Sequence, residues 1–479
     1  MSSITSDEIK ATGTAQVIVV LESAPPPPPS AGLAAGGVAF AAAAAHAPQL
    51  AGLENYFVHQ GGQNDALAAA GMSNVAALAP TKSIARPRAV KSPPSVLHFP
   101  NLGVMLGTVT REGLQGLRAD PRVKKVVGAP QFSLIRPVET AAAQLNTKVT
   151  WGIDFLKVPK LWDQGLSGNG IMVGHLDTGA DGKHSALKTA IAAFAEFNSF
   201  GIQVKPAPKA HDTGEHGTHT AATIAGREVR GQSVGVAPKA SLASAIVIEG
   251  GNVIARILGG MDWSITQNVR LLSMSLGLRG FFDDFLVVTQ ILRSKNILPV
   301  FAVGNEGPAT SRSPGNYSQA LSVGACDKNK RIGVFSSSQR FVRTDDPLVP
   351  DLVGPGVDVI SAKPGGGFQV MSGTSMATPH IAGLAALLFE AKPTATANEV
   401  ETALLNSCEL GPISRERGNR GFPDGVRALA ALIGTPVGGS KATKAATKKS
   451  STKKTSGKKA GKKASGTAKA SKKSTAKKK

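Results

Sequence analysis

Five short apolar runs recur through the middle of the chain, separated by longer stretches with a helical pattern. Each run is apolar at consecutive positions, which is typical of strands buried on both faces of a parallel sheet. The runs cover residues 171–176, 242–248, 271–276, 297–303 and 321–325. The stretch from Ser375 instead repeats its apolar residues at helical spacing. The pattern predicts an α/β fold, a doubly wound, mainly parallel sheet flanked by helices, over about residues 151–433.

A smaller pattern precedes this domain. Residues 16–22 and 103–109 read as strands, a helix is predicted to begin after the cap residue Thr110, and a further strand is predicted over 123–127. Strand, helix and strand in so short a stretch predict a small α+β module that folds around its own core.

A segment rich in Ala, Pro and Gly, from about residue 24 to residue 94, splits this module. We interpret it as an insertion, flexible or semi-rigid, with a short helix near residues 65–78. The predicted domains are therefore 1–145, the module with its insertion, 146–436, the α/β domain, and 437–479, a tail.

Charge distinguishes the tail from the rest of the chain. The formal net charge is +22, and sixteen lysines within residues 441–479 account for all of it except +6. Because this stretch uses only Lys, Ala, Thr, Ser and Gly, it cannot bury enough apolar surface to offset the entropy of ordering, and we predict disorder. Such a run favours binding to DNA, RNA or another polyanion, and a purely solubilising tail is the alternative.

Cysteine content and the absence of targeting signals bear on the compartment. Only Cys326 and Cys408 are present, which excludes a disulfide framework and fits a reducing environment. No apolar run reaches ~18 residues, so no transmembrane segment is expected. The opening MSSITSDEIK has no basic stretch leading into an apolar one, so no signal peptide is predicted. The cytoplasm is favoured, with secretion or the cell surface left open.

A histidine cluster offers the first candidate chemistry. Residues 211–226 read HDTGEHGTHTAATIAG, with His216 and His219 three positions apart and Glu215 outside the pair. The zinc motif HExxH needs its histidines at i and i+4 with the glutamate between them. The spacing therefore argues against a metal site and favours a histidine that transfers protons.

Other polar residues stand at the ends of predicted strands: Asp177, Ser275 and Asn305. The carboxyl ends of parallel strands share an edge where ligands bind in such folds. Each residue alone is better explained as a helix cap or a turn residue. Their meaning depends on the sequence around them.

Four sequence blocks connect these positions. They are IMVGHLDTG at 171–179, HGTHTAATIAG at 216–226, FAVGNEG at 301–307 and SGTSMATPH at 372–380. In this order they resemble the blocks of subtilisin-like serine endopeptidases, the subtilase family. The resemblance covers about residues 151–433 and implies a serine endopeptidase with a subtilisin-like fold.

The resemblance also implies roles for single residues. Ser375 would be the nucleophile, His216 the general base and then the general acid, and Asp177 the group that orients His216. Asn305 would donate its side-chain amide to the oxyanion. A predicted helix start at Ser375 suits this chemistry, because first-turn amides point toward developing negative charge. Pro379 is expected within that first turn, where no amide needs a helical partner.

Substrate recognition can be carried over in part. By resemblance, an extended peptide would pair as an added strand along one wall of the site. The base of the specificity pocket falls near Arg312, which would either favour acidic substrate side chains or be a solvated loop charge. The two walls correspond to Ser275, Leu276 and Gly277 on one side and to Ala302, Val303 and Gly304 on the other.

The N-terminal module resembles the inhibitory propeptide of the same family, although the insertion at 24–94 departs from the family's pattern. The resemblance implies that the C-terminal end of the module lies in the active cleft and that the enzyme cuts itself between about Arg136 and Thr150. An unrelated adaptor domain is the alternative.

No cofactor is expected, and a structural calcium stays open because no clear cluster of oxygen ligands is present. The other histidines of the α/β domain are expected to be structural. These are His175, His184, His211, His219 and His380. The alternative to a protease is a polyanion-binding or nucleic-acid-binding protein that uses the protease-like domain as a scaffold, and the complete set of catalytic residue types favours the enzyme.

Overall fold

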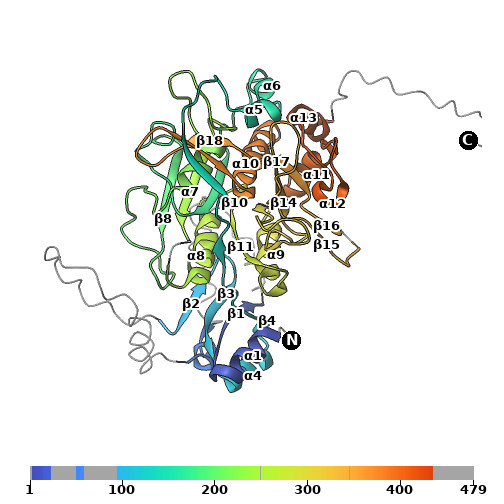
Figure 1. Ribbon diagram of the computed structural model, residues 1–479. Helices are drawn as coiled ribbons and strands as arrows, with labels where there is room; N and C mark the ends of the chain where they lie inside the picture. Colours follow the sequence, from blue (N-terminus) through green and yellow to red (C-terminus); the bar gives the residue numbers. More distant parts are fainter. Residues whose placement is uncertain (1–2, 23–49, 59–93, 249, 345, 435–479) are drawn as a thin grey trace, which may run out of the picture. The chain divides into compact units, whose positions relative to one another are not determined.

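The computed structural model describes residues 3–22, 50–58, 94–248, 250–344 and 346–434. Its larger sheet is the parallel sheet flanked by helices that the sequence predicts (Figure 1). This seven-stranded sheet is parallel throughout. Its strands, in spatial order, are β17 (Leu352–Pro355), β14 (Leu321–Cys326), β12 (Leu298–Ala302), β10 (Leu271–Met274), β7 (Met172–Asp177), β9 (Ser241–Ile246) and β8 (Ile191–Glu196). The α/β class predicted from the apolar runs is confirmed.

Consecutive residues of these strands pack into two cores, one on each face of the sheet. Leu271 belongs to one core and its neighbour Leu272 to the other, and neither side chain is exposed to solvent. Because side chains alternate between the faces of a sheet, both faces must be apolar, which explains the uninterrupted apolar runs. The covering helices are α7 (His216–Ala225) and α10 (Thr374–Ala391) on the first face and α8 (Val253–Thr266) and α9 (Leu286–Ser294) on the second.

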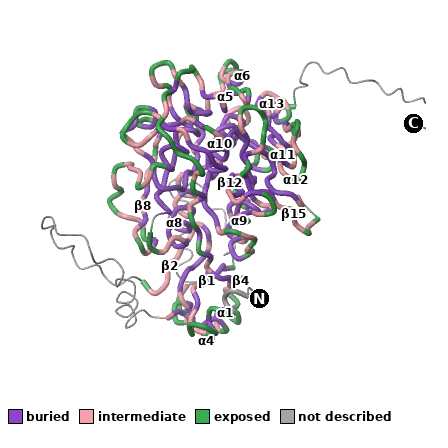
Figure 2. Tube along the Cα trace, viewed as in Figure 1, coloured by how far each residue is buried: buried purple, intermediate pink, exposed green. Residues whose placement is uncertain are grey.

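Helix α10 is the central element of the first core. Every residue of the helix from Thr374 to Phe389 is buried, and Figure 2 shows this region in purple inside the molecule. A helix that is apolar on all sides is stable only inside a core. The helical pattern predicted from Ser375 onward is thus confirmed, and it fixes the position of the first turn of α10 against the sheet.

The N-terminal module has a separate four-stranded antiparallel sheet. Its strands, in spatial order, are β2 (Val96–Phe99), β3 (Val104–Val109), β1 (Ala15–Leu21) and β4 (Val123–Gly128). Helix α4 (Arg111–Ala119) begins where predicted, and the Thr110 hydroxyl accepts a hydrogen bond from the Gly113 amide at 3.2 Å. The predicted strands and helix are present, and β2 and the opening helix α1 (Ser3–Thr12) were not foreseen.

Part of the predicted insertion belongs to the core of this module. Leu53, in the short helix η1 (Leu53–Tyr56), is fully buried beside β1 and β3, and Phe57 forms a bridge with Val109. This packing contradicts a uniformly flexible segment at these positions, because two apolar side chains fix it to the sheet. The helix predicted near 65–78 lies outside the described residues.

One predicted strand, 271–276, is divided at Ser275. After β10 ends, β11 (Leu276–Arg279) leaves the large sheet and pairs with β13 (Arg312–Ser313) and β5 (Ser133–Leu134). Apolar residues on both sides of the break gave no sign of it in the sequence. None of the helices among the residues that the structure describes is long and apolar enough to span a membrane.

Candidate active site

The first two predicted site residues form a buried pair. Asp177 ends β7 and His216 begins α7, and the His216 Nδ1 lies 2.7 Å from the Asp177 Oδ1. The other carboxylate oxygen accepts a hydrogen bond from the Thr220 hydroxyl at 3.1 Å, and the Thr178 amide donates to Oδ1 at 2.7 Å. These three hydrogen bonds to Asp177 define the orientation of the imidazole and the carboxylate.

Electrostatics fix the protonation of this pair. Burial alone would raise the pKa of Asp177, but the charge and the hydrogen bond of His216 outweigh it and hold the pKa below the ordinary value. An ionised carboxylate can only accept, so Nδ1 carries a proton, and Nε2 is the ring nitrogen left to accept one from a substrate or a hydroxyl. His216 Nε2 is buried and has no hydrogen-bond partner.

Ser375 lies in the first turn of α10 and is completely buried. Its hydroxyl donates to the carbonyl oxygen of Ile135 at 2.7 Å. Pro379 lies one turn later than the sequence suggested, inside the helix, so its missing N–H deprives the Ser375 carbonyl of a helical partner. The Ser275 hydroxyl donates to that carbonyl instead, at 3.4 Å, which links one predicted wall of the site to the backbone of the predicted nucleophile.

Asn305 follows β12 and has a fixed side-chain orientation. Its Oδ1 accepts hydrogen bonds from the Thr374 amide and the Thr374 hydroxyl, both at 2.9 Å. The amide nitrogen Nδ2 therefore points away from Thr374, and it donates to the carbonyl oxygen of Arg136 at 2.9 Å. The neighbouring Gly304 has a φ of 121° and belongs to the left-handed region that favours glycine.

A segment of the chain itself occupies the site. We call residues 132–143 the strap. Upstream, β5 pairs antiparallel with β11, and the Ile135 amide donates to the Ser275 carbonyl at 3.1 Å. Ile135 is buried, and the Phe132 ring packs edge-on against Phe285 with centroids 4.9 Å apart. The predicted wall of Ser275, Leu276 and Gly277 thus pairs with an extended strand of the chain itself.

Downstream, the strap continues as a second added strand. The Val138 amide donates to the Ser372 carbonyl at 2.8 Å. From there β6 (Glu139–Ala143) pairs antiparallel with β19 (Phe368–Ser372), with Glu139 opposite Ser372 and Ala143 opposite Phe368. This pairing was not foreseen, because ETAAA has neither alternation nor β-branched residues apart from Thr140.

The strap does not present one carbonyl to both the predicted nucleophile and the predicted oxyanion donor. The Ser375 hydroxyl contacts the carbonyl of Ile135, whereas the Asn305 amide contacts the carbonyl of the next residue, Arg136. Attack on a carbonyl carbon requires the same group to face the nucleophile and the oxyanion donor. The serine proton is also directed to Ile135 and not to His216 Nε2. The geometry is unproductive for cleavage.

The opposite wall, formed by Ala302, Val303 and Gly304, and the base of the specificity pocket near Arg312 differ in part from what the sequence suggested. The Val303 carbonyl accepts from the Arg312 amide at 2.9 Å, and Ala302 ends β12 in the core. The Arg312 guanidinium pairs with Glu306 at 2.5 Å and donates to the Ser133 hydroxyl at 3.0 Å. Its side chain is 14% exposed, so Arg312 is neither a solvated loop charge nor an unpaired cation.

The other histidines have structural surroundings. Burial lowers the pKa of His219 to about 3 and that of His380 to about 4, so both rings are neutral near pH 7. His219 donates from Nε2 to the Val359 carbonyl, and His380 donates from Nδ1 to the Met376 carbonyl. In the part of the chain that the structure describes, no group of three His, Cys, Asp or Glu residues could hold a metal ion.

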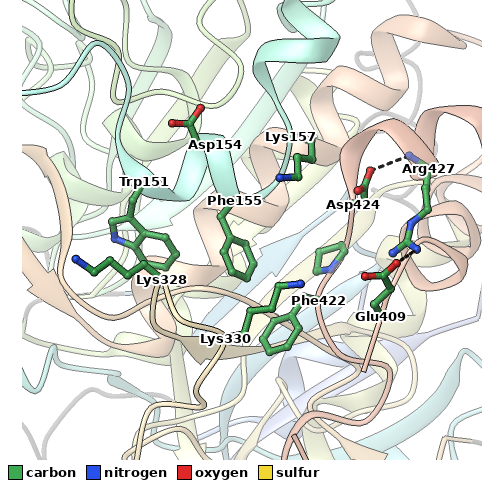
Figure 3. A pocket seen from close by; sticks show the side chains of 11 residues that line it. Trp151, Asp154, Phe155, Lys157, Lys328, Lys330, Glu409, Phe422, Asp424 and Arg427 are labelled. Atoms are coloured by element: carbon green, nitrogen blue, oxygen red, sulfur yellow. Dashed lines mark hydrogen bonds and ion pairs between the residues drawn. The ribbon is translucent and has the colours of Figure 1, made fainter. Parts of the chain in front are cut away.

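A second concavity, about 450 Å³ in volume, contains none of the predicted site residues. Figure 3 shows Phe155 and Phe422 at its centre, with the amines of Lys157 and Lys330 beside them. Arg427 at its edge is already paired with Glu409. The predicted site residues therefore gather at the strap-filled cleft and not at this pocket.

Comparison with known proteins agrees with the geometry of the cleft. The profile described as the subtilase family matches residues 168–456. A thermostable alkaline protease of Halalkalibacterium halodurans is 33% identical over 308 residues, 64% of this chain and 78% of that protein. An intracellular serine protease of Paenibacillus polymyxa is 36% identical, covering 51% and 74% of the two chains. Subtilisin E of Bacillus subtilis is 31% identical, covering 64% and 76%.

Proposed function

The chain belongs to the subtilase family of serine endopeptidases, and on this premise we propose that Asp177, His216 and Ser375 are its catalytic triad. The observation that supports this proposal best is the buried pair of Asp177 and His216, with the basic Nε2 of the imidazole left without a partner. A serine hydroxyl needs such a base to become a nucleophile at neutral pH.

The reaction follows from these positions once a substrate replaces the strap. His216 Nε2 accepts the hydroxyl proton of Ser375 as Oγ attacks the substrate carbonyl carbon, and Asp177 stabilises the imidazolium. The imidazolium then gives its proton to the leaving nitrogen, and the C–N bond breaks. Water then attacks the acyl-serine ester while His216 accepts one of its protons, and His216 returns that proton to Ser375 Oγ as the ester C–O bond breaks and the carboxylic acid leaves.

The oxyanion of the tetrahedral intermediate would be stabilised by Asn305 Nδ2 together with the Ser375 backbone amide. Thr374 already fixes the orientation of the Asn305 side chain, so this donor needs no reorganisation during the reaction. Ser275, Leu276 and Gly277 would bind the substrate backbone. Ala302, Val303 and Gly304 would form the opposite wall. No cofactor is required in this mechanism, and a structural calcium remains open.

We further propose that the N-terminal module is an intramolecular inhibitor and that the enzyme removes it. The strap supports this, because it occupies the cleft as a substrate would but offers adjacent carbonyls to Ser375 and Asn305. Rotation of the peptide groups beside Arg136, with the strand pairs on both sides kept, would bring one of these carbonyls to both groups. The first cut then falls at one of the two bonds flanking Arg136, with Ile135–Arg136 favoured, because Pro137 lacks the N–H of an ordinary leaving amide. This position is at the N-terminal limit of the range expected from the sequence.

A covalent serine-directed probe tests the proposed triad. We expect wild type to be labelled at Ser375, and Ser375→Ala and His216→Ala to lose labelling, whereas His211→Ala keeps it as a surface-histidine control. Labelling that persists in Ser375→Ala would contradict the assignment. A wild-type protein that binds no probe after its N-terminal module has been removed would favour the scaffold alternative.

The lysine-rich residues 441–479 support a second, additional proposal: non-specific binding of DNA, RNA or another polyanion. Sixteen lysines without an acidic residue would release many counterions from a phosphate backbone. Binding should weaken steeply between about 50 and 200 mM salt. A tail-deleted chain that binds duplex DNA as well as the full chain would refute this.

A further inference from the structure

The downstream half of the strap is bound through its backbone. Strand β6 forms the edge of the three-stranded sheet β18-β19-β6, with β18 (Val359–Ala362) on the far side of β19. Five residue pairs keep β6 in register with β19, yet the side chains from Glu139 to Ala142 are exposed. An added strand of this kind obtains its affinity from ladder hydrogen bonds and needs no particular side chains.

The chain beyond β6 is attached to the catalytic domain independently. Leu145 is buried in the core shared with α7 and α10, and the Gln232 side-chain amide donates to its carbonyl. The Ser233 amide donates to the Lys148 carbonyl at 2.8 Å, and the Thr150 amide donates to the Ser233 carbonyl at 3.2 Å. A cut beside Arg136 therefore leaves β6 tethered to the domain only a few residues from its binding strand.

A tether of this length keeps the effective concentration of β6 high, in the millimolar range for short linkers. The residues next to the new N-terminus would then continue to fill the part of the cleft that receives substrate residues after the scissile bond. Incoming substrate would have to displace an intramolecular competitor. Removal of the upstream module alone does not remove this competitor.

The tethered strand cannot be cut by its own Ser375. Glu139 lies opposite Ser372, already downstream of the nucleophile, and every later residue of β6 is farther along the same strand pair. Moving a bond of residues 139–147 back to Ser375 would require the chain to slide and pull Leu145 out of the core. A second molecule would have to cut it.

We propose that β6 stays paired with β19 after the cut beside Arg136 and keeps the cleft partly blocked, and that activation therefore needs a second, intermolecular hydrolytic cut between about residues 139 and 148. In each cut one water is consumed, one C–N bond breaks, and a carboxylate and an amine are formed. The second cut releases β6 or loosens it from β19. This inference rests on the proposed self-cleavage.

Time courses of intact mass, N-terminal sequence and activity on an unstructured protein substrate test it together. We expect a first N-terminus at Arg136 or Pro137 whose rate of appearance does not depend on enzyme concentration. A second N-terminus, between about residues 140 and 148, should appear at a rate that rises in proportion to enzyme concentration. Activity should increase roughly tenfold or more with the second terminus and not with the first.

Proline substitutions separate the docking of β6 from its cleavage. In an edge strand, every second N–H points toward the neighbouring strand. Of the two variants Thr140→Pro and Ala141→Pro, at least one therefore loses a hydrogen-bond donor to β19. That variant should gain its activity with the first cut. Ala141→Val keeps the N–H and should retain the lag.

Three outcomes are distinguishable. Full wild-type activity while residues 137–150 are still attached would overturn the inference, as would a lag that neither proline variant shortens. A wild-type chain that makes no first cut would instead contradict the proposed self-cleavage on which the inference rests.

Discussion

The two halves of the strap contact the catalytic domain in opposite ways. Upstream of Arg136, the Phe132 and Ile135 side chains are buried in the domain and the backbone pairs with β11. Downstream, β6 pairs with β19 over a longer stretch, but most of its side chains are exposed. The upstream half therefore depends on which residues it contains, and the downstream half depends mainly on an extended backbone.

The difference indicates how one cleft can combine selectivity with breadth. Burial of apolar side chains contributes roughly 25 cal/mol per Å² and discriminates between residues, whereas ladder hydrogen bonds are the same for almost every sequence. Substrates should be selected by the residues before the scissile bond. Residues after it should be tolerated widely, provided that the chain can extend along β19.

The largest effect is expected from a charge in the upstream half. Ile135→Asp places a carboxylate in a buried position, which should raise amide hydrogen exchange across the strap by a factor on the order of 10³. The measurement is made in a Ser375→Ala background, so that the strap stays uncut. Thr140→Asp, in the exposed half, should leave exchange nearly unchanged. Equal effects of both substitutions would remove the distinction between the halves.

Asn305 lies at the junction of the two halves. Asn305→Ala removes the amide that contacts the Arg136 carbonyl, and it should lower turnover by about 10²–10³ while KM changes little. Steady-state kinetics of the processed enzyme measures this. Thr310→Ala, on the loop after Asn305 and without contact to the strap, is the matched control. A loss confined to KM would mean that Asn305 only binds substrate.

A smaller effect should come from the contact between the N-terminal module and α8. The Asp262 carboxylate accepts from the Asn101 and Leu102 amides at 2.7 and 3.0 Å and from the Asn101 side chain at 3.0 Å. Asp262→Asn converts one acceptor into a donor, which should increase exchange of residues 100–103 about tenfold in the Ser375→Ala background. The control Asp7→Asn, at an exposed position, should leave this exchange unchanged. If Asp262→Asn also leaves it unchanged, the strap alone holds the module on the domain.

A further effect concerns acid stability and leaves the contacts of the strap unchanged. Native His219 and His380 stay neutral down to pKa values of about 3 and 4, against an ordinary value of 6.5, so the unfolded chain binds more protons as the pH falls below 6.5. Each of the two histidines should therefore reduce the free energy of unfolding by up to about 1.4 kcal/mol for every unit by which the pH falls, between pH 6.5 and the native pKa of that histidine. His219→Gln and His380→Asn should flatten the pH dependence in urea titrations of the Ser375→Ala chain, and exposed His211→Asn should not.

Much of the catalytic domain could be predicted because its signals are local. The apolar runs identify strands that are buried on both faces, as Leu271 and Leu272 illustrate, and the blocks around Asp177, His216 and Ser375 place polar residues at one end of the sheet. Edge strands β8 and β17 escaped prediction because IAAFAE and LVGP are short and carry no distinctive pattern.

The strap could not be predicted in the same way. Its conformation is imposed by β11 and β19, whose residues lie more than a hundred positions away in the sequence, and ETAAA has no intrinsic preference for a strand. The ion pair of Arg312 with Glu306 was missed for a similar reason. Only the fold brings β13 beside β11 and directs the guanidinium toward Ser133 and not toward solvent.

The measurement that tests the account most directly is time-resolved mass spectrometry of wild type and Ser375→Ala during incubation at neutral pH. We predict that the first wild-type fragments end at Ile135 or Arg136 and that Ser375→Ala stays intact under the same conditions. First fragments cut elsewhere, or the same fragments from Ser375→Ala, would contradict the claim that the strap lies in the cleft as the enzyme's own first substrate.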